Sequence, residues 1–406
     1  MNHVEILPPH PLRADYTRHL PAGSAEDLFQ RRLEPQNFNG RYLDHLVKVL
    51  EQALDRDPQD GRSAYMLAFC LLQNSADRAA VYRANALLDR TRADGSTTRT
   101  PGAERLRALT TSIISRMERP LPGIRPIAYR VNWSINNRCP MACRGCYNPF
   151  AADQISAETA YEIIDRLVAH GTTDVVVSGG DPLLWPPVFD VVDRMRAAGL
   201  RVALDTTGYT LDTGKIDRLK NSLDSIRLPL DGSTPDIQRA FRRNNDPDLV
   251  SRLQGSLRLC DDAGFHAVRV HTVVSKQNVD DLPAIAEKIF GHQSVKQWVL
   301  FQWWGRRAAR HLVKEMAVSR EEVLQAVTAL KADYPGKEIH FAAAEERELV
   351  NFFIQSSGQV VTMASGHAEE FIVGALPTGD LADIVTSPIL DFSAIHCGLP
   401  VSVPQG

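Results

Sequence analysis

Three cysteines lie close together directly after an alternating apolar run. Cys139, Cys143 and Cys146 have the spacing C-x3-C-x2-C, and the run before them, residues 127–135, predicts a β-strand. Thiolates are the ligands that iron–sulfur clusters and zinc prefer, and a loop of this length can wrap around one such centre. Structural zinc sites normally add a second spaced pair of ligands, and the sequence has no second closely spaced cysteine pair. The motif therefore predicts a soft metal centre with three ligands from one loop.

The three-cysteine motif closely resembles that of the radical S-adenosylmethionine (radical SAM) superfamily. The resemblance implies that Cys139, Cys143 and Cys146 hold one [4Fe–4S] cluster, whose fourth iron binds the amino and carboxylate groups of S-adenosylmethionine. It also implies an external one-electron reductant, flavodoxin- or ferredoxin-like, whose electron splits the sulfonium so that a 5′-deoxyadenosyl radical takes a hydrogen from the substrate. A structural zinc loop with a distant fourth ligand is the alternative interpretation of the cysteines.

A glycine pair follows the second predicted strand. Gly179, Gly180, Asp181 and Pro182 resemble the Gly-Gly-Glu-Pro motif of the superfamily, with Asp181 in place of the commoner Glu. Glycines lack a side chain, so the backbone can approach a ligand closely. The resemblance implies that this segment holds the ammonium group of S-adenosylmethionine, whereas an isolated tetrapeptide of this kind would be read as a turn.

Polar residues also end the third and fourth predicted strands. Asp205 and Thr206 match a strand-end position that faces the methionyl or ribose part of S-adenosylmethionine, and Asp231 resembles an aspartate expected at the ribose hydroxyls. The alternative for each is a turn or a helix N-cap. The superfamily often has an aromatic residue between the second and third cysteines, where this chain has Gly145, so stacking of adenine on Tyr147 is a hypothesis.

Two further features lie at the ends of the fifth and sixth predicted strands. Strand alternation points His271 into the barrel, where it is either a satisfied core residue or a contact to substrate or cofactor. The stretch 301–307, Phe-Gln-Trp-Trp-Gly-Arg-Arg, either binds a carboxylate, a phosphate or a peptide backbone, or forms a packing corner with a solvated basic helix start.

These motifs are carried by alternating strands and helices, the signature of a parallel sheet with right-handed crossovers. Six strand–helix units match the partial (β/α)6 barrel of the superfamily, so the predicted fold class is α/β with a TIM-like partial barrel over residues 127–333. The chemistry of such barrels collects at the C-terminal ends of the strands, where the cysteines lie. The predicted strands are residues 127–135, 174–178, 201–206, 225–230, 266–274 and 295–302.

The flanking regions differ in pattern from the barrel. Residues 1–120 show only helical periodicity, which predicts an all-helical N-terminal domain that either docks a partner or stabilises the fold, followed by a proline-rich linker at 120–126. Residues 334–406 predict a small α+β extension. It weakly resembles the SPASM or twitch extension of some radical SAM enzymes, but only Cys397 lies beyond Cys260, so we expect no auxiliary cluster.

Composition limits the partners. The 406 residues are 44% hydrophobic and 23% charged with a net charge of −3, which gives no reason to expect nucleic acid or membrane binding. The N-terminus lacks a signal-peptide pattern and no apolar run approaches ~18 residues, so we expect a cytoplasmic protein. The expected substrate is a small molecule or a peptide.

The resemblance predicts an enzyme that modifies a ribosomally made peptide or a metabolite by hydrogen abstraction. A glycyl-radical activating enzyme is one alternative, because the run Cys146-Tyr147-Asn148 occurs in some activating enzymes of the superfamily. A non-enzymatic zinc-binding protein is the other. The sequence leaves the substrate and the outcome of the radical reaction open.

Overall fold

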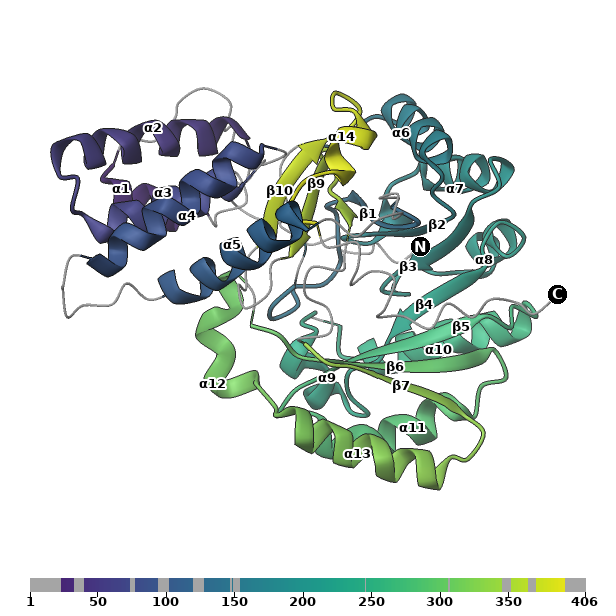
Figure 1. Ribbon diagram of the computed structural model, residues 1–406. Coiled ribbons are helices and arrows are strands. Elements are labelled where there is room, and N and C mark those ends of the chain that lie inside the picture. The colour runs from purple at the N-terminus through teal and green to yellow at the C-terminus, as the bar shows by residue number, and fades with distance from the viewer. Residues whose placement is uncertain are drawn as a thin grey trace. The chain divides into compact units, whose positions relative to one another are not determined.

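The computed structural model in Figure 1 divides into two compact units. The described residues of one unit lie within 129–344 and 354–357, and those of the other lie within 23–128, 352–353 and 358–390; the boundary passes through β8 (Phe353–Ile354). The structure describes residues 23–32, 40–73, 77–93, 102–119, 128–146, 148, 154–244, 246–305, 307–344, 352–363 and 370–390.

The first unit is an α/β partial barrel, which confirms the predicted fold class. Its parallel strands lie side by side in sequence order, and each of the six expected strands is present. A further strand, β7, pairs in parallel with β6 and extends the sheet beyond the six expected. The strands are β1 (Arg130–Asn136), β2 (Asp174–Gly179), β3 (Arg201–Asp205), β4 (Ser225–Pro229), β5 (Val268–Val274), β6 (Val295–Gln302) and β7 (Glu338–Ala342).

Helices lie along the outer side of this sheet (Figure 1). Their ends follow local capping signals: the Ser156 side chain accepts from Thr159 N at the start of α6, and Gly171 ends that helix with φ 104°. The helices of this unit are α6 (Ala157–His170), α7 (Val188–Ala197), α8 (Thr213–Leu219), α9 (Pro235–Phe241), α10 (Leu249–Asp262), α11 (Leu282–Phe290), α12 (Val313–Met316) and α13 (Arg320–Asp333).

The two faces of the barrel strands differ in chemistry. Outward positions are apolar and buried against the helices; in β5, Val268 and Val270 are 0% and 1% exposed. The alternate positions of β5 face the interior and include Arg269 and His271. The outer face therefore supplies the core, and polar side chains line the inside of the barrel.

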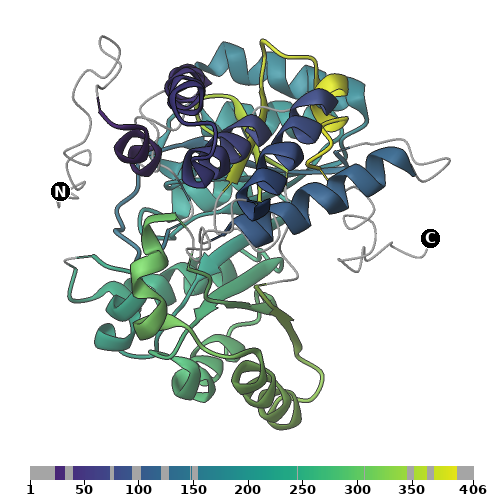
Figure 2. The ribbon, with the colours of Figure 1, turned by 60° about the vertical axis from the view of Figure 1, so that its left-hand side comes forward.

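The second unit combines the N-terminal helices with the C-terminal hairpin. Its helices α1 to α4 pack side by side in both ribbon views (Figures 1 and 2), and β9 and β10 pair antiparallel. The Gln73 side chain accepts from Ile372 N at 2.8 Å, and the rings of Phe69 and Phe371 are 5.1 Å apart, so helix α3 is tied to the hairpin. The elements are α1 (Ala25–Arg31), α2 (Gly40–Arg56), α3 (Gly61–Leu72), α4 (Arg78–Ala93), α5 (Ala103–Glu118), β9 (Gln359–Met363), β10 (Glu370–Ala375) and α14 (Leu381–Val385).

The predicted domain ranges, 1–120, 127–333 and 334–406, remain predictions. Among the described helices, none combines the length and the apolar character that a membrane crossing requires.

Candidate active site

The three cysteines lie on the loop that follows β1, at the C-terminal end of the barrel strands, and all three are half-buried. The last residue of α9 and the segment that follows it hold this loop through backbone hydrogen bonds. Ala142 N donates to Arg243 O and Arg144 N donates to Phe241 O, both at 2.8 Å. Contacts within the protein therefore hold the loop close to the end of α9.

Gly145, between the second and third cysteines, has a left-handed φ of 90°. A Cβ at this position would lie 3.2 Å from both Ala309 Cβ and Trp303 Nε1, so a larger side chain would force these neighbours apart. The left-handed backbone and this crowding both disfavour an aromatic side chain at position 145. Tyr147, proposed as an alternative stacking residue, lies outside the described residues.

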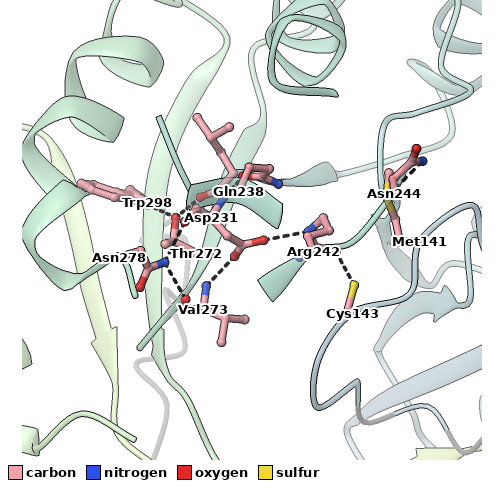
Figure 3. A network of polar contacts seen from close by, with 11 residues as sticks. Met141, Cys143, Asp231, Gln238, Arg242, Asn244, Thr272, Val273, Asn278 and Trp298 are labelled. Atoms are coloured by element: carbon pink, nitrogen blue, oxygen red, sulfur yellow. Dashed lines mark hydrogen bonds and ion pairs between the residues drawn. The ribbon is translucent and has the colours of Figure 1, made fainter. Parts of the chain in front are cut away.

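An arginine lies against the cysteine loop, as Figure 3 shows. Arg242 Nη1 is 3.6 Å from Cys143 Sγ, and Arg242 Nε donates to Asp231 Oδ2 at 2.7 Å. Burial lowers the pKa of Arg242, but Asp231 and Cys143 outweigh it and raise this pKa above its usual value. The guanidinium is therefore a permanent positive charge beside one of the thiols.

Asp231, at the end of β4, is fully buried and is held by the protein (Figure 3). Its Oδ1 accepts from Val273 N at 2.8 Å, and its backbone N donates to Gln238 Oε1 at 2.8 Å. Asn278 Nδ2 donates to Asp231 O at 2.8 Å. The structure therefore places this residue behind Arg242, where it orients the guanidinium; its expected contact to ribose stays a prediction.

The thiols of Cys139 and Cys143 are neutral when no metal is bound. Burial raises the pKa of Cys143 to about 12, and burial followed by the neighbouring Cys143 raises the pKa of Cys139 well above its usual value. Iron or zinc binding would displace these protons. The described residues contain no group of three His, Cys, Asp or Glu side chains drawn together as around a single metal ion. The fit to an iron–sulfur cluster rests on the donor set: one loop carries three thiols, and the Arg242 guanidinium lies beside the second of them, Cys143.

The glycine pair packs against the backbone just before the first cysteine. Gly180 N donates to Asn136 O at 2.7 Å, and Asp181 N donates to Arg138 O at 2.6 Å. A Cβ on Gly180 would lie 2.1 Å from Arg138 O, a distance that no side chain can adopt. Glycine at this position therefore lets the end of β2 support the cysteine loop.

Asp181 and Thr206 are brought together by the structure. The Asp181 carboxylate is fully buried and accepts from Thr206 Oγ1 at 2.8 Å, from Leu183 N at 3.1 Å, and from the N and Oγ1 of Thr207. Burial raises the pKa of Asp181, and these hydrogen bonds oppose the rise. Asp181 thus ties the ends of β2 and β3 together, and Pro182 begins a short 3-10 turn, Pro182–Leu184.

The Asp205 side chain takes no part in the contacts of Asp181 and pairs with an arginine. Its Oδ1 lies 3.2 Å from Arg227 Nη1, inside the barrel and on the neighbouring strand β4. The cofactor roles expected for Gly179, Gly180, Asp181, Pro182, Asp205, Thr206 and Asp231 stay predictions.

Trp303 forms a packing corner. It is 4% exposed and lies in an apolar cluster with Phe241, Ala309 and Met316, against which Cys143 packs. This agrees with the packing alternative for Trp303. Arg306 lies outside the described residues.

Sequence reasoning missed several arginines. Arg242 carries no sequence signal, because its partners lie far away in the chain. Arg130, Arg227 and Arg269 did carry one: each is a charged residue next to an apolar one in a strand, at a position that faces the barrel interior. His271 is half-buried beside the ring of Phe301, with 5.0 Å between centroids, and desolvation followed by Arg227 lowers its pKa well below the usual value.

Comparison with known proteins identifies a family: residues 133–289 match the radical SAM superfamily. A PqqA peptide cyclase of Ruegeria pomeroyi is 34% identical over 108 residues, 25% of this chain and 29% of that protein. A mycofactocin maturase, MftC, of Mycobacterium tuberculosis is 26% identical over 178 residues, 43% of this chain and 44% of that protein. The chain thus spans less than half the length of these relatives.

Solved structures share the fold at low identity. The structure of anSMEcpe with bound AdoMet and the Cp18Cys peptide has a TM-score of 0.52 and 12% identity, covering 66% of this chain and 82% of that one. Streptococcus suis SuiB bound to S-adenosylmethionine has a TM-score of 0.51 and 12% identity, covering 83% of each chain.

A parallel partial barrel with a three-cysteine loop after its first strand defines the class of protein, an α/β fold of the partial-barrel type. Residues 133–289, which include the cysteine loop, match the radical SAM superfamily, and this match confirms the resemblance drawn from the cysteine motif.

Proposed function

We propose that the protein is a radical SAM enzyme that modifies a biosynthetic substrate, either a ribosomally made peptide or a small metabolite, by hydrogen abstraction. The observation that carries this proposal is the loop with Cys139, Cys143 and Cys146 at the C-terminal end of β1, buttressed by Gly180 and contacted by Arg242. The match of residues 133–289 to the superfamily covers this loop and the strands around it.

The three cysteines would hold a single [4Fe–4S] cluster. When bound, the cluster and S-adenosylmethionine supply reductive cleavage of the sulfonium, with an electron from a flavodoxin- or ferredoxin-like protein, and a 5′-deoxyadenosyl radical. Arg242 donates toward Cys143 and balances negative charge on that thiolate, because hydrogen bonds to charged groups are the stronger ones. Asp231 keeps the guanidinium in place.

The ends of β2 and β3 would form the wall against the cofactor. Gly179 and Gly180 bring backbone close to the cysteine loop, and Asp181 with Thr206 joins the two strand ends into one rigid edge. Such a locked edge suits a bound sulfonium compound, since positioning requires side chains fixed by their own hydrogen bonds.

The names of relatives support a substrate of either kind. The names of the cyclase and the maturase indicate peptide modification. The name of an AdoMet-dependent heme synthase of Methanosarcina barkeri, which is 28% identical over 160 residues, indicates a small molecule. If the substrate is a peptide, the helices of the second unit are the proposed docking element.

Oxygen-free reconstitution with iron and sulfide tests the proposal. We expect about four irons per chain and, with dithionite, release of 5′-deoxyadenosine from S-adenosylmethionine. Cys→Ala at 139, 143 or 146 should abolish this release. Cys260→Ala is the matched control, because Cys260 is a buried thiol on α10 and should keep iron content and activity. Bound zinc with no cleavage of S-adenosylmethionine would refute the proposal in favour of a structural metal.

A further inference from the structure

Three arginines face the interior of the partial barrel. Arg130 lies on β1, Arg227 on β4 and Arg269 on β5, and Arg227 and Arg269 are direct partners in the β4–β5 ladder. Arg227 is 8% exposed. The arginines also act on one another's charge: burial, then Arg227, lowers the pKa of Arg130 to about 10, and burial followed by Arg227 also lowers the pKa of Arg269.

The protein offers this arginine group little negative charge. Asp205 contacts Arg227 at 3.2 Å, but the buried Arg227 Nε has no hydrogen-bond partner. In the part of the chain that the structure describes, Arg130 and Arg269 make no ion pair at all. The other nearby carboxylates have partners of their own: Asp174 pairs with Arg201 at 2.8 Å, and Glu338 accepts from Gln297 at 2.9 Å.

Like charges gathered in a partly buried interior are unfavourable unless an anion joins them. Guanidinium groups also match carboxylate and phosphate oxygens in pairs, which makes a group of them a recognition site for oxyanions. A group used only to hold the fold would be expected to have its carboxylate partners built in, as Arg242 has in Asp231.

We propose that Arg130, Arg227 and Arg269 bind an oxyanion of the substrate, a carboxylate or phosphate, deep inside the barrel. This assignment rests on the proposed radical SAM function, for which it names the class of substrate.

The order of residues along β5 gives the substrate its orientation. Arg269, His271 and Val273 all face inward, and Val273 packs against the cluster that contains Trp303 and touches Cys143. Val273 lies four residue steps after Arg269 along the strand, about 13 Å at ~3.3 Å per step. The oxyanion would thus sit at the far end from the cysteine loop, with the reacting part of the substrate between them.

His271 lies between these ends. Burial and the surrounding arginines keep its imidazole neutral, so it adds no positive charge to the group and can hydrogen-bond the substrate.

The test uses the reconstituted protein and two probes, glutarate and inorganic phosphate, titrated against chloride at equal ionic strength. We expect either probe to raise the midpoint of thermal unfolding saturably. The variants are Arg269→Gln and Arg130→Gln. Arg227 is left in place because its removal would also leave the Asp205 carboxylate without its ion-pair partner. Arg194→Gln is the control, since Arg194 is a half-exposed arginine on α7 paired with Asp165.

Each variant should bind the probes at least tenfold more weakly, while the control binds as the wild type does. In chloride alone, the variants should unfold at the same or a higher temperature, because a like charge has been removed; a structural arginine would give a lower one. Equal binding of the probes in wild type and Arg269→Gln would overturn the proposal.

The carboxylate of S-adenosylmethionine is a second source from which the oxyanion could come. Equilibrium dialysis distinguishes it: the proposal expects unchanged S-adenosylmethionine affinity in Arg269→Gln, and a tenfold loss would assign the arginines to the cofactor and overturn the substrate assignment. Saturable probe binding in a wild-type protein that never cleaves S-adenosylmethionine would refute the proposed function but not the oxyanion site.

Discussion

Replacing Arg242 by Met separates what the guanidinium does for the fold from what it does for the metal centre. The Arg242–Asp231 pair is inaccessible: the side chains are 15% and 0% exposed, with 2.7 Å between Nε and Oδ2. Breaking such a pair leaves a buried carboxylate uncompensated and costs ~3–5 kcal/mol of unfolding free energy. Among the described residues, Val273 N is the donor that remains to that carboxylate, so little compensation is available.

A double-mutant cycle with Asp231→Asn measures the coupling between the two residues. Urea unfolding of the four apo proteins should give a double variant that is more stable than the sum of the single losses predicts, by about 1–3 kcal/mol. Arg252→Met is the matched control. Its pair with Asp246 is 2.8 Å long, but the Arg252 side chain is 46% exposed, so the loss should stay below about 1 kcal/mol.

The same variant has a redox consequence. Arg242 Nη1 lies 3.6 Å from Cys143 Sγ, and a positive donor there favours the more negative, reduced state of a bound cluster. Each ~1.4 kcal/mol of this preference corresponds to about 59 mV for a one-electron couple. Arg242→Met should therefore lower the cluster potential in an EPR-monitored titration. An unchanged or higher potential, or additive stability losses in the cycle, would contradict the reasoning.

Three further predictions concern local contacts. Gly180→Ala should destabilise by several kcal/mol and lower the iron content after reconstitution, since its Cβ would lie 2.1 Å from Arg138 O; Gly199→Ala, with φ 85° and nothing within 4 Å, should cost only ~1 kcal/mol in urea unfolding. Ser319→Ala removes one half of the capping box of α13 and should cost ~1 kcal/mol, with iron binding unchanged. A hydrogen bond from Arg218 lowers the pKa of Asp193, so its stabilising contribution is complete above about pH 4 and is lost as the pH falls through the lowered pKa. The stability difference between wild type and Asp193→Asn, measured in urea, should therefore shrink from pH 6 to pH 3, and a difference that grows would show the sign to be wrong.

The sequence sufficed where the controlling interactions are local. Strand alternation before Cys139 and the ligand spacing after it lie within one short segment, so the position of the metal loop at the end of β1 could be predicted. Gly180 was also found, and the structure adds a contact within the protein that the sequence did not show: the N–H of Gly180 donates to Asn136 O.

Partners far apart in the chain could not be predicted. Asp231 and Asp181 were recognised as residues of the site, but the sequence could not show that their oxygens accept from Arg242 and from Thr206 and Thr207. The reason is that a carboxylate at a strand end can be satisfied by a ligand or by any donor that the fold brings to it, and only the three-dimensional packing decides which.

The cysteine loop is held from two directions by contacts that need no metal. On one side, backbone N–H groups just after β2 donate to the carbonyls of Asn136 and Arg138. On the other side, carbonyls at and just after the end of α9 accept from the N–H groups of Ala142 and Arg144. Arg144 also pairs with Glu315 of α12. Because these contacts fix the backbone on both sides of Cys139 and Cys143, a cluster would meet ligands already placed, and its binding energy is not consumed in ordering the loop. Rigid placement of this kind would keep a bound cluster at one edge of the barrel and leave the interior, with the proposed oxyanion site, to the substrate.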